Sequence, residues 1–206
     1  MNKELNTRTR AQILAAAKTE FAKEGFRAAS LRSIVRSVGM TTGAFYGYYK
    51  SKEALFDALV GEQYAHLMDC YRKAHQDFAA LPPAEQPKHM SDISGRCLEE
   101  MLHYAYANLE VFKLILLRSD GTRFSHMVDE MVALELQATH DYQAVLAQLG
   151  QPVPAIDERL EHILITGMFN AYFELVIHEM PLQQALEYLR ELRSFYTAGW
   201  LKIMGQ

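Results

Sequence analysis

The chain has 206 residues, half of them hydrophobic, with 25 Asp+Glu against 21 Lys+Arg and a formal net charge of −4. This length gives one large or two small domains enough material for a core, and the negative total excludes a uniformly basic nucleic-acid coat protein. Two cysteines, Cys70 and Cys97, cannot make a disulfide framework. The first residues show no secretory signal, so we expect a cytoplasmic protein.

The charge is divided unevenly along the chain. The first 55 residues hold ten Lys+Arg and four Asp+Glu, whereas the remainder holds eleven and twenty-one. A basic N-terminal segment on an acidic body indicates that this segment meets a polyanion. On charge alone, a solvated segment that happens to be basic remains an equal alternative.

Nearly every segment has helical periodicity, and no strand or hairpin pattern is present, so we expect an all-α protein. Gly25 is a plausible helix stop, Ser30 a good N-cap and Gly39 the end of the next helix. In the N-terminal part we expect helices at about 9–24, 31–38, 41–48 and 52–76. A proline-containing loop is expected over 80–91, followed by helices at about 92–108, 110–118, 123–149, 155–179 and 182–204.

Three short helices with a tight turn at Gly39 form a helix-turn-helix pattern. The second helix has one apolar face, formed by Leu31, Ile34, Val35 and Val38. In the third helix, Phe45 and Tyr49 lie four residues apart and supply the packing edge. The rest of that segment is expected to be largely exposed, and it is uncharged and rich in small residues and hydroxyls: Thr41, Thr42, Gly43, Ala44, Tyr46, Gly47 and Tyr48.

Such a surface suits the major groove of DNA. Small residues and threonine hydroxyls let the backbone approach base edges closely. Tyrosine hydroxyls can reach phosphate oxygens, and nearby cations can position the backbone of the duplex. The candidate cations are Arg32, Lys50 and Lys52.

A longer motif runs through the same region: Gly25-Phe26, Ser30-Leu31, Ile34, Gly39-Met40, Gly43-Ala44-Phe45-Tyr46, Tyr49, Ser51-Lys52-Glu53 and Leu55. With this motif, the segment from about Thr9 to Leu59, roughly a quarter of the chain, resembles the N-terminal signature of the tetracycline-repressor (TetR) family of transcriptional regulators. It departs from that family at Val35 and Val38, where small alanines are usual, and we expect slight repacking there.

The resemblance implies a helix-turn-helix DNA-binding domain over 1–52 and a helical ligand-binding and dimerisation domain over 53–206. It also implies a homodimer that places two copies of the third helix in successive major grooves of a palindromic double-stranded operator. The residues nearest the bases would be Thr41, Thr42, Gly43, Ala44 and Tyr48. Tyr46, Lys50 and Lys52 would hold phosphates, and Arg32 would touch the backbone or an outer base. Arg8 and Arg10 precede the expected first helix and could reach DNA, although a frayed terminus is the alternative.

The acidic body carries the expected partner and effector surfaces. Its last two helices have broad apolar faces that fit a two-fold four-helix interface, where the family places its dimer contact; a fully intramolecular core is the alternative. The middle helices would enclose a pocket for a small molecule, lined by His103, Tyr106, Phe112, Met127, Met131, Met168, Asn170 and Phe173. Each of these residues also fits a plain core position. Asn170 would need hydrogen-bond partners if buried, in the pocket or across the dimer seam.

The implied mechanism is a population shift. The effector stabilises a conformer in which the two copies of the third helix are wrongly spaced for the operator, and the repressor then leaves the DNA. The long helix that starts at Lys52 is the expected lever. The sequence does not fix whether the ligand releases or promotes DNA binding.

The main rival is a helical enzyme or a metal-binding protein with a His/Glu site in the acidic body. His-Glu-x-x-His, Gly-x-Ser-x-Gly and phosphate-loop patterns are absent, and Cys70 and Cys97 lack ligand spacing. Glu174 and His178 could share a metal, but two ligands do not make a zinc site. We therefore expect no enzyme, no metal and no cofactor.

Two further alternatives are weaker. A helical interaction module without DNA binding would differ from a DNA-binding protein in lacking a steep salt dependence. Membrane association is not expected, because the most apolar stretch, residues 163–173, is shorter than the roughly 20 residues that span a bilayer.

Overall fold

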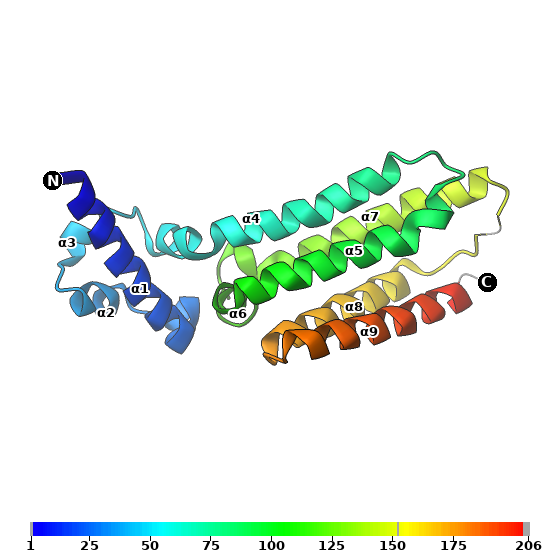
Figure 1. Ribbon diagram of the computed structural model, residues 1–206. Coiled ribbons are helices and arrows are strands. Elements are labelled where there is room, and N and C mark those ends of the chain that lie inside the picture. Colours follow the sequence, from blue (N-terminus) through cyan, green and yellow to red (C-terminus); the bar gives the residue numbers. More distant parts are fainter. Residues whose placement is uncertain (1, 152, 204–206) are drawn as a thin grey trace. The chain divides into compact units, whose positions relative to one another are not determined.

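The computed structural model describes residues 2–151 and 153–203, and over these ranges the chain is helical without a strand (Figure 1). The predicted all-α fold is confirmed. The elements are α1 (Asn2–Ala28), α2 (Leu31–Ser37), α3 (Thr42–Phe45), α4 (Lys52–Ala79), α5 (Gln86–Ala107), α6 (Leu109–Arg118), the 3₁₀ turn η1 (Arg123–His126), α7 (Met127–Gln148), α8 (Glu158–Ile177) and α9 (Leu182–Ile203).

The chain divides into two compact units. The N-terminal unit comprises the described residues of Met1–Ala65 with Glu110–Ser125, and the C-terminal unit comprises His66–Leu109 with those of His126–Gln206. The expected boundary after residue 52 is where α4 begins, but the N-terminal unit continues into α4 and takes up most of α6. Aromatic packing explains this extension, because the ring of Phe124 lies 5.8 Å from that of Phe56 and 5.1 Å from that of Tyr64 on α4.

Gly25 interrupts α1 near its end. Its φ of 75° and ψ of 165° lie in a region that is almost restricted to glycine. The expected helix stop at Gly25 is therefore present, although one more turn follows it, in which the Ala29 N–H donates to the Gly25 carbonyl at 3.0 Å. This break lets Phe26 turn inward, where it contacts Phe21 and Phe56.

The substitution Gly25→Ala should destabilise the N-terminal unit by about 2 kcal/mol, because a Cβ is strained at this φ and ψ. Space is not the obstacle, since the nearest atom to an added methyl group would be the Arg118 carbonyl oxygen at 3.9 Å. Thermal unfolding followed by circular dichroism measures the effect. Ala28→Gly in the same last turn is the control for a general loss of helix propensity, and an equal effect of both changes would contradict this account.

The α4–α5 connection is shorter than predicted. We expected a loop over 80–91, but α5 begins at Gln86 with Pro87 in its first turn. Proline is accepted there because the first N–H groups of a helix have no partner within the helix. The buried Gln86 amide donates to the carbonyls of Ala79 at 3.4 Å and Leu81 at 3.2 Å, which closes the loop.

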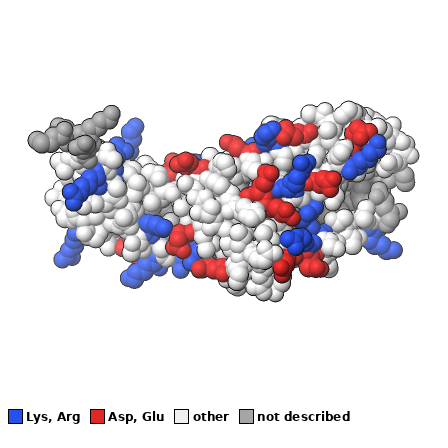
Figure 2. All heavy atoms as spheres, in the orientation of Figure 1, with Lys and Arg blue, Asp and Glu red and all other residues white. Residues whose placement is uncertain are grey.

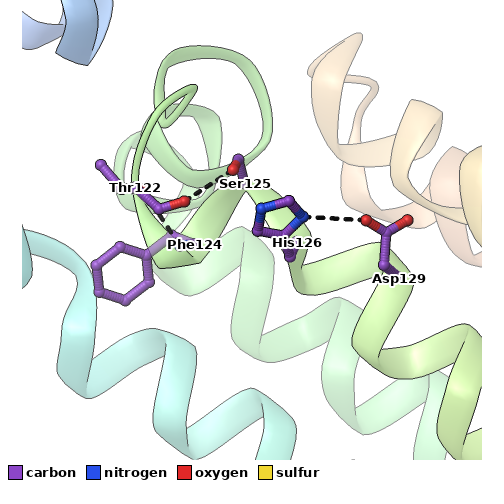
Figure 3. Close-up of polar contacts among 5 residues, drawn as sticks. All are labelled: Thr122, Phe124, Ser125, His126 and Asp129. Atoms are coloured by element: carbon purple, nitrogen blue, oxygen red, sulfur yellow. Dashed lines mark hydrogen bonds and ion pairs between the residues drawn. The ribbon is translucent and has the colours of Figure 1, made fainter.

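Short-range polar contacts order the connection between α6 and α7 (Figure 3). The Thr122 hydroxyl accepts the Phe124 N–H at 3.2 Å, and the Ser125 hydroxyl donates to the Thr122 carbonyl at 2.8 Å. At the start of α7, Nδ1 of His126, the last residue of η1, lies 3.2 Å from an Asp129 carboxylate oxygen. These contacts order the 3₁₀ turn that directly precedes α7.

The C-terminal unit is a helical bundle in which α8 packs against α5, α7 and α9. Its core side chains include Met101, Leu102, Met131, Phe169, Tyr172, Phe173, Val176 and Leu189. Hydrogen bonds join the layers: Tyr106 Oη donates to the Leu175 carbonyl at 2.8 Å, and Tyr172 Oη to the Leu98 carbonyl at 3.0 Å. The buried Glu161 carboxylate on α8 contacts two side chains of α7. His140 Nε2 lies 2.8 Å from one oxygen, and the Gln143 amide donates to the other at 3.1 Å.

Among the described helices, α8 alone has the length and apolar composition to cross a bilayer. We expected no stretch long enough to span a bilayer, because the most apolar residues, 163–173, form a shorter segment. In the bundle, 39% of the apolar stretch of α8 is buried. Its apolarity therefore serves internal packing on one side, and the other side presents exposed apolar residues that are described below.

Candidate nucleic-acid interface

The start of α2 is held by a cap and a carboxylate. Ser30 Oγ accepts the Ser33 N–H at 3.3 Å, as the sequence predicts for an N-cap. Glu20 on α1 receives the Ser30 N–H at 3.0 Å and the Ser33 hydroxyl at 2.9 Å. The sequence reasoning did not find this role of Glu20, because the contact spans ten or more residues. It fixes the angle at which α2 leaves α1.

The turn between α2 and α3 needs a glycine. Gly39 has a φ of 69°, and the Met40 N–H donates back to the Val35 carbonyl at 2.8 Å, which closes the end of α2. Thr41 then caps α3 by accepting the Ala44 N–H on its hydroxyl oxygen at 3.2 Å. A helix-turn-helix with a defined turn results.

The packing edge of α3 is the one predicted. Phe45 is fully buried and Tyr49 is 8% exposed, with their rings stacked at 5.8 Å. Tyr46, by contrast, is 55% exposed. Of the remaining residues in the segment, Thr41, Gly43, Ala44 and Gly47 are exposed and Thr42 and Tyr48 are half-buried. The uncharged ridge therefore faces outward, which is the arrangement that groove insertion requires.

α3 is shorter than expected. The α-helical part covers Thr42–Phe45, and Tyr46–Tyr48 continue as hydrogen-bonded turns, with the Tyr48 N–H donating to the Phe45 carbonyl at 2.8 Å. Gly43 and Gly47 disfavour a longer helix because glycine loses the most backbone entropy there. The two turns nevertheless keep Phe45 and Tyr49 on one side.

Positive charge surrounds this ridge. Arg32 in the first turn of α2, Arg36 in its last turn and Lys50 after α3 are all exposed. On the face drawn in Figure 2, Lys and Arg prevail over α1–α3, whereas Asp and Glu are frequent over the C-terminal unit. The expected division of charge thus coincides with the unit that holds the helix-turn-helix.

Lys52 differs from the other candidate cations. Its ammonium donates to the carbonyls of Phe26 at 2.7 Å, Arg27 at 3.2 Å and Ala29 at 3.2 Å, and it lies 4.6 Å from the centre of the Phe26 ring. These bonds use all three N–H groups of the ammonium. In the structure the Lys52 ammonium is therefore engaged at the end of α1 and is not free for the phosphate contact expected of it.

Arg8 and Arg10 also differ from expectation. Both lie within α1, which begins at Asn2 and not near Thr9. Arg10 Nε donates to Asn6 Oδ1 at 3.2 Å, and its guanidinium lies 5.6 Å from the centre of the Tyr49 ring. Arg10 is thereby tied to the packing edge of α3 and is not part of a frayed arm.

The residues expected around an effector are spread over different environments. Met127, Met131 and Phe173 are buried in the C-terminal unit, and Tyr106 and Met168 are half-buried there. His103 and Asn170 are exposed, so the condition under which the Asn170 amide would need buried partners is not met in the single chain. Phe112 is fully buried on α6, in the N-terminal unit.

α8 and α9 carry an exposed apolar surface, which we call the α8–α9 face. It consists of the exposed side chains Leu160, Ile163, Tyr188, Phe195 and Leu201. An open groove of about 480 Å³ runs along it, lined by Leu175, Tyr188, Glu191, Leu192 and Phe195. The exposed fractions of Ile163 (63%) and Phe195 (71%) are large for such side chains in a monomer surface. Asn170 lies seven residues after Ile163 on α8 and so shares its side of the helix.

Glu174 and His178 form an exposed ion pair, with Oε2 and Nε2 2.9 Å apart. Within the described ranges, no cluster of three or more His, Cys, Asp or Glu side chains is arranged to hold a metal ion. This pair therefore has no third ligand of that kind beside it.

Comparison with known proteins finds a family model and relatives that are similar to this region. Residues 13–59 match the model of the bacterial regulatory proteins of the tetR family. An uncharacterised HTH-type transcriptional regulator of Bacillus subtilis, YerO, is 37% identical over 65 residues, which are 32% of this chain and 22% of that protein. The match thus spans about a fifth of the length of this relative.

Solved structures extend the likeness to the whole fold. A transcriptional regulator from Aquifex aeolicus VF5 is 21% identical, with a TM-score of 0.54 over 89% of this chain and 96% of that one. The regulator FadR of Bacillus subtilis, solved in complex with stearoyl-CoA, is 16% identical, with a TM-score of 0.54 over 92% and 98%. At these identities the likeness shows a shared fold.

Proposed function

We propose that this chain, which carries the DNA-binding domain of the TetR family of transcriptional regulators, binds a palindromic operator as a homodimer and leaves it when a small molecule binds. The observation that carries the proposal is the outward-facing uncharged ridge of residues 41–48 above a fully buried Phe45. A ridge without charge, bordered by exposed cations, fits base edges inside a groove and phosphates at its rims.

The residues on and beside the ridge fall into two groups, those that would contact bases and those that would contact phosphates. Thr41, Thr42, Gly43, Ala44 and Tyr48 would lie nearest the bases. Because the Thr41 oxygen already accepts the Ala44 N–H, that hydroxyl keeps its hydrogen for a base acceptor. Tyr46, Lys50 and Arg32 would hold phosphates. Lys52 is left out of this set because its ammonium is bonded to the end of α1.

A second copy of the chain would cover the α8–α9 face. The exposed Ile163 and Phe195 are the kind of apolar anchors that a two-fold interface buries. Asn170, on the same side of α8 as Ile163, would form hydrogen bonds across the seam. The dimer would then carry two copies of the ridge of residues 41–48, one for each half-site of a palindromic operator.

The effector would bind within the C-terminal unit. Buried Met127 and Met131 are adaptable, and Phe173 and Tyr106 add an aromatic wall with one polar group. That the fold can hold a small molecule is illustrated by FadR, which was solved with stearoyl-CoA. Since α4 begins in the N-terminal unit and ends in the C-terminal unit, it is the covalent route by which effector binding would alter operator affinity.

The proposal is tested by selecting DNA fragments from the source genome with the purified protein and reading their shared sequence. We expect a palindrome whose binding weakens steeply as salt rises. Thr42→Ala should relax the preference at one base pair in each half-site, by roughly 5- to 100-fold in discrimination, whereas Tyr46→Phe should weaken all sequences alike.

Thr19→Ala, on the exposed side of α1, is the matched control and should leave both properties unchanged. If the protein selects no common sequence, or if its DNA affinity is independent of salt, the proposed function is wrong. If Thr42→Ala and Tyr46→Phe both bind as the unchanged protein does, the assignment of the ridge is wrong.

A further inference from the structure

One carboxylate lies along the apolar side of α7 for which we propose effector binding. Glu135 follows Met127 and Met131 at steps of four residues, so the three side chains share a side of the helix. The two methionines are buried, whereas the Glu135 side chain is 29% exposed. The carboxylate therefore stands where the apolar interior of the C-terminal unit meets solvent, and a ligand can reach it.

Residues from three helices meet at this carboxylate. The Tyr71 hydroxyl on α4 donates to Glu135 Oε2, and His75 Nε2, one turn further along α4, lies 3.3 Å from the same oxygen. Phe169 on α8 is fully buried, with its ring centre 5.6 Å from that of Tyr71. All four residues belong to the C-terminal unit. Both polar contacts use Oε2 and neither uses Oε1, so the carboxylate can accept a further donor.

Glu135 is held in its charged form. Burial alone would raise the pKa of this carboxyl group, but the hydrogen bonds with His75 and Tyr71 outweigh burial, and the pKa lies below its usual value. Burial and the Glu135 charge raise the pKa of Tyr71 well above its ordinary value, so the phenol stays a donor at neutral pH. A negative charge thus stands at the edge of an apolar interior, where its attraction for a cation is less screened than in open solvent.

The surroundings of Glu135 offer little positive charge. The described part of the C-terminal unit has no buried Lys or Arg, and the charged side chain that is buried there, Glu161, is a second carboxylate. Arg72, next to Tyr71 in the sequence, pairs with Asp69 at 3.0 Å and with Glu130 at 3.7 Å. An anionic ligand would therefore find no buried cation to pair with, whereas a cationic ligand would find a carboxylate.

We propose that this site binds an organic cation, a protonated amine on an apolar body, with the ammonium group on Glu135 and the apolar body along Met131 and Met127. The nearby rings of Tyr71 and Phe169 add to the attraction, because aromatic faces carry partial negative charge. The proposal names the chemical class of the effector and rests on the proposed function in that respect only. The binding of the cation itself does not rest on it.

A brace between α4 and α7 is the competing role of Glu135. In that role the carboxylate serves only as an acceptor for Tyr71 and His75, and its charge recognises no ligand. Arg72 and Glu130 already join the same two helices nearer the surface. The two roles differ in their consequences, because the loss of a brace lowers stability alone, whereas the loss of a recognition group changes which ligands bind.

The test is isothermal titration calorimetry of the full-length protein, without DNA, with three series of phenylalkyl probes. The probes carry two to six methylene groups and end in an amine, an alcohol or a carboxylate, so that at each length only the end group differs. We expect the best amine to bind at least about 100-fold more tightly than the carboxylate of equal length, with the alcohol in between, because a hydrogen bond to a charged group is typically worth about tenfold or more.

Glu135→Gln keeps the size of the side chain and an acceptor for Tyr71 but removes the charge. It should reduce the preference for the amine over the alcohol by roughly 10- to 100-fold. Glu130→Gln is the matched control, because it removes a carboxylate from the same helix whose partner is Arg72. That variant should keep the full preference for the amine.

The proposal is overturned if the carboxylates bind as tightly as the amines, or if no amine of the series binds. It is also overturned if Glu135→Gln is folded by circular dichroism and keeps the full preference. A lower melting temperature with an unchanged order of ligands would then assign Glu135 to the brace. Should Glu135→Gln fail to fold, the order of the three end groups on the unchanged protein still decides.

Operator binding is measured separately, with and without the best amine. An operator affinity that the amine leaves unchanged overturns only its role as effector. A failure to bind any DNA overturns the proposed function but not the cation site.

Discussion

Replacing both Ile163 and Phe195 by glutamate should prevent the proposed pairing of two chains and lower operator affinity by a hundredfold or more. Both side chains are largely exposed in the single chain, at 63% and 71%. Burying each against a partner stabilises the dimer by roughly 1.5–3 kcal/mol, and two-fold symmetry counts each contribution twice. The double substitution removes these contributions and would place four carboxylates in the seam, where an unpaired charge is costly.

The effect on DNA binding follows from linkage of the two ridges. Once one half-site is bound, the second binding event is intramolecular, and such linkage raises affinity by roughly 10²- to 10⁴-fold. Sedimentation velocity measures the association state, and fluorescence anisotropy with full and half operators measures DNA affinity. The double variant should bind both operators equally weakly.

Leu117→Glu is the matched control, because Leu117 is also an exposed apolar residue, at 46%, but lies on α6. It should leave the dimer intact. A double variant that remains dimeric at micromolar concentration would show that the α8–α9 face is not the pairing surface.

The helix-turn-helix formed by α2 and α3 could be predicted from the sequence, because the residues that determine it lie close together along the chain. Ser30 and Thr41 cap helices three residues away, Gly39 takes the positive φ of the turn, and Phe45 and Tyr49 share a helical side. Each of these features depends on spacings of one to seven residues. The burial of Phe45 and the exposure of Tyr46 follow from the same periodicity.

Features that depend on distant residues could not be predicted in this way. The phosphate role expected of Lys52 relied on its position in the motif, yet the carbonyls that bind it lie 23 to 26 residues earlier. Asn170 is exposed, although Phe169 and Tyr172 beside it in the sequence are buried.

The second large effect is expected from Lys52→Met, which should destabilise the N-terminal unit by about 2–3 kcal/mol. The ammonium forms three charge-assisted hydrogen bonds to the carbonyls at the end of α1, each typically worth about 1.5–3 kcal/mol before exposure to solvent is taken into account. Lysine there also complements the negative end of the α1 dipole. Methionine keeps the length of the side chain and its contact with Phe26 but leaves these carbonyls without their donor.

Hydrogen exchange measured by mass spectrometry should show this loss as faster exchange over α1 and α2, with little change in α8. Lys50→Met is the matched control, because Lys50 is an exposed neighbour for which we propose a phosphate contact. That variant should keep its stability but lose about one unit of the slope of log affinity against log salt. If instead Lys52→Met reduces the salt slope and leaves exchange unchanged, its ammonium leaves the carbonyls of α1 to bind a phosphate, and the motif-based expectation is restored.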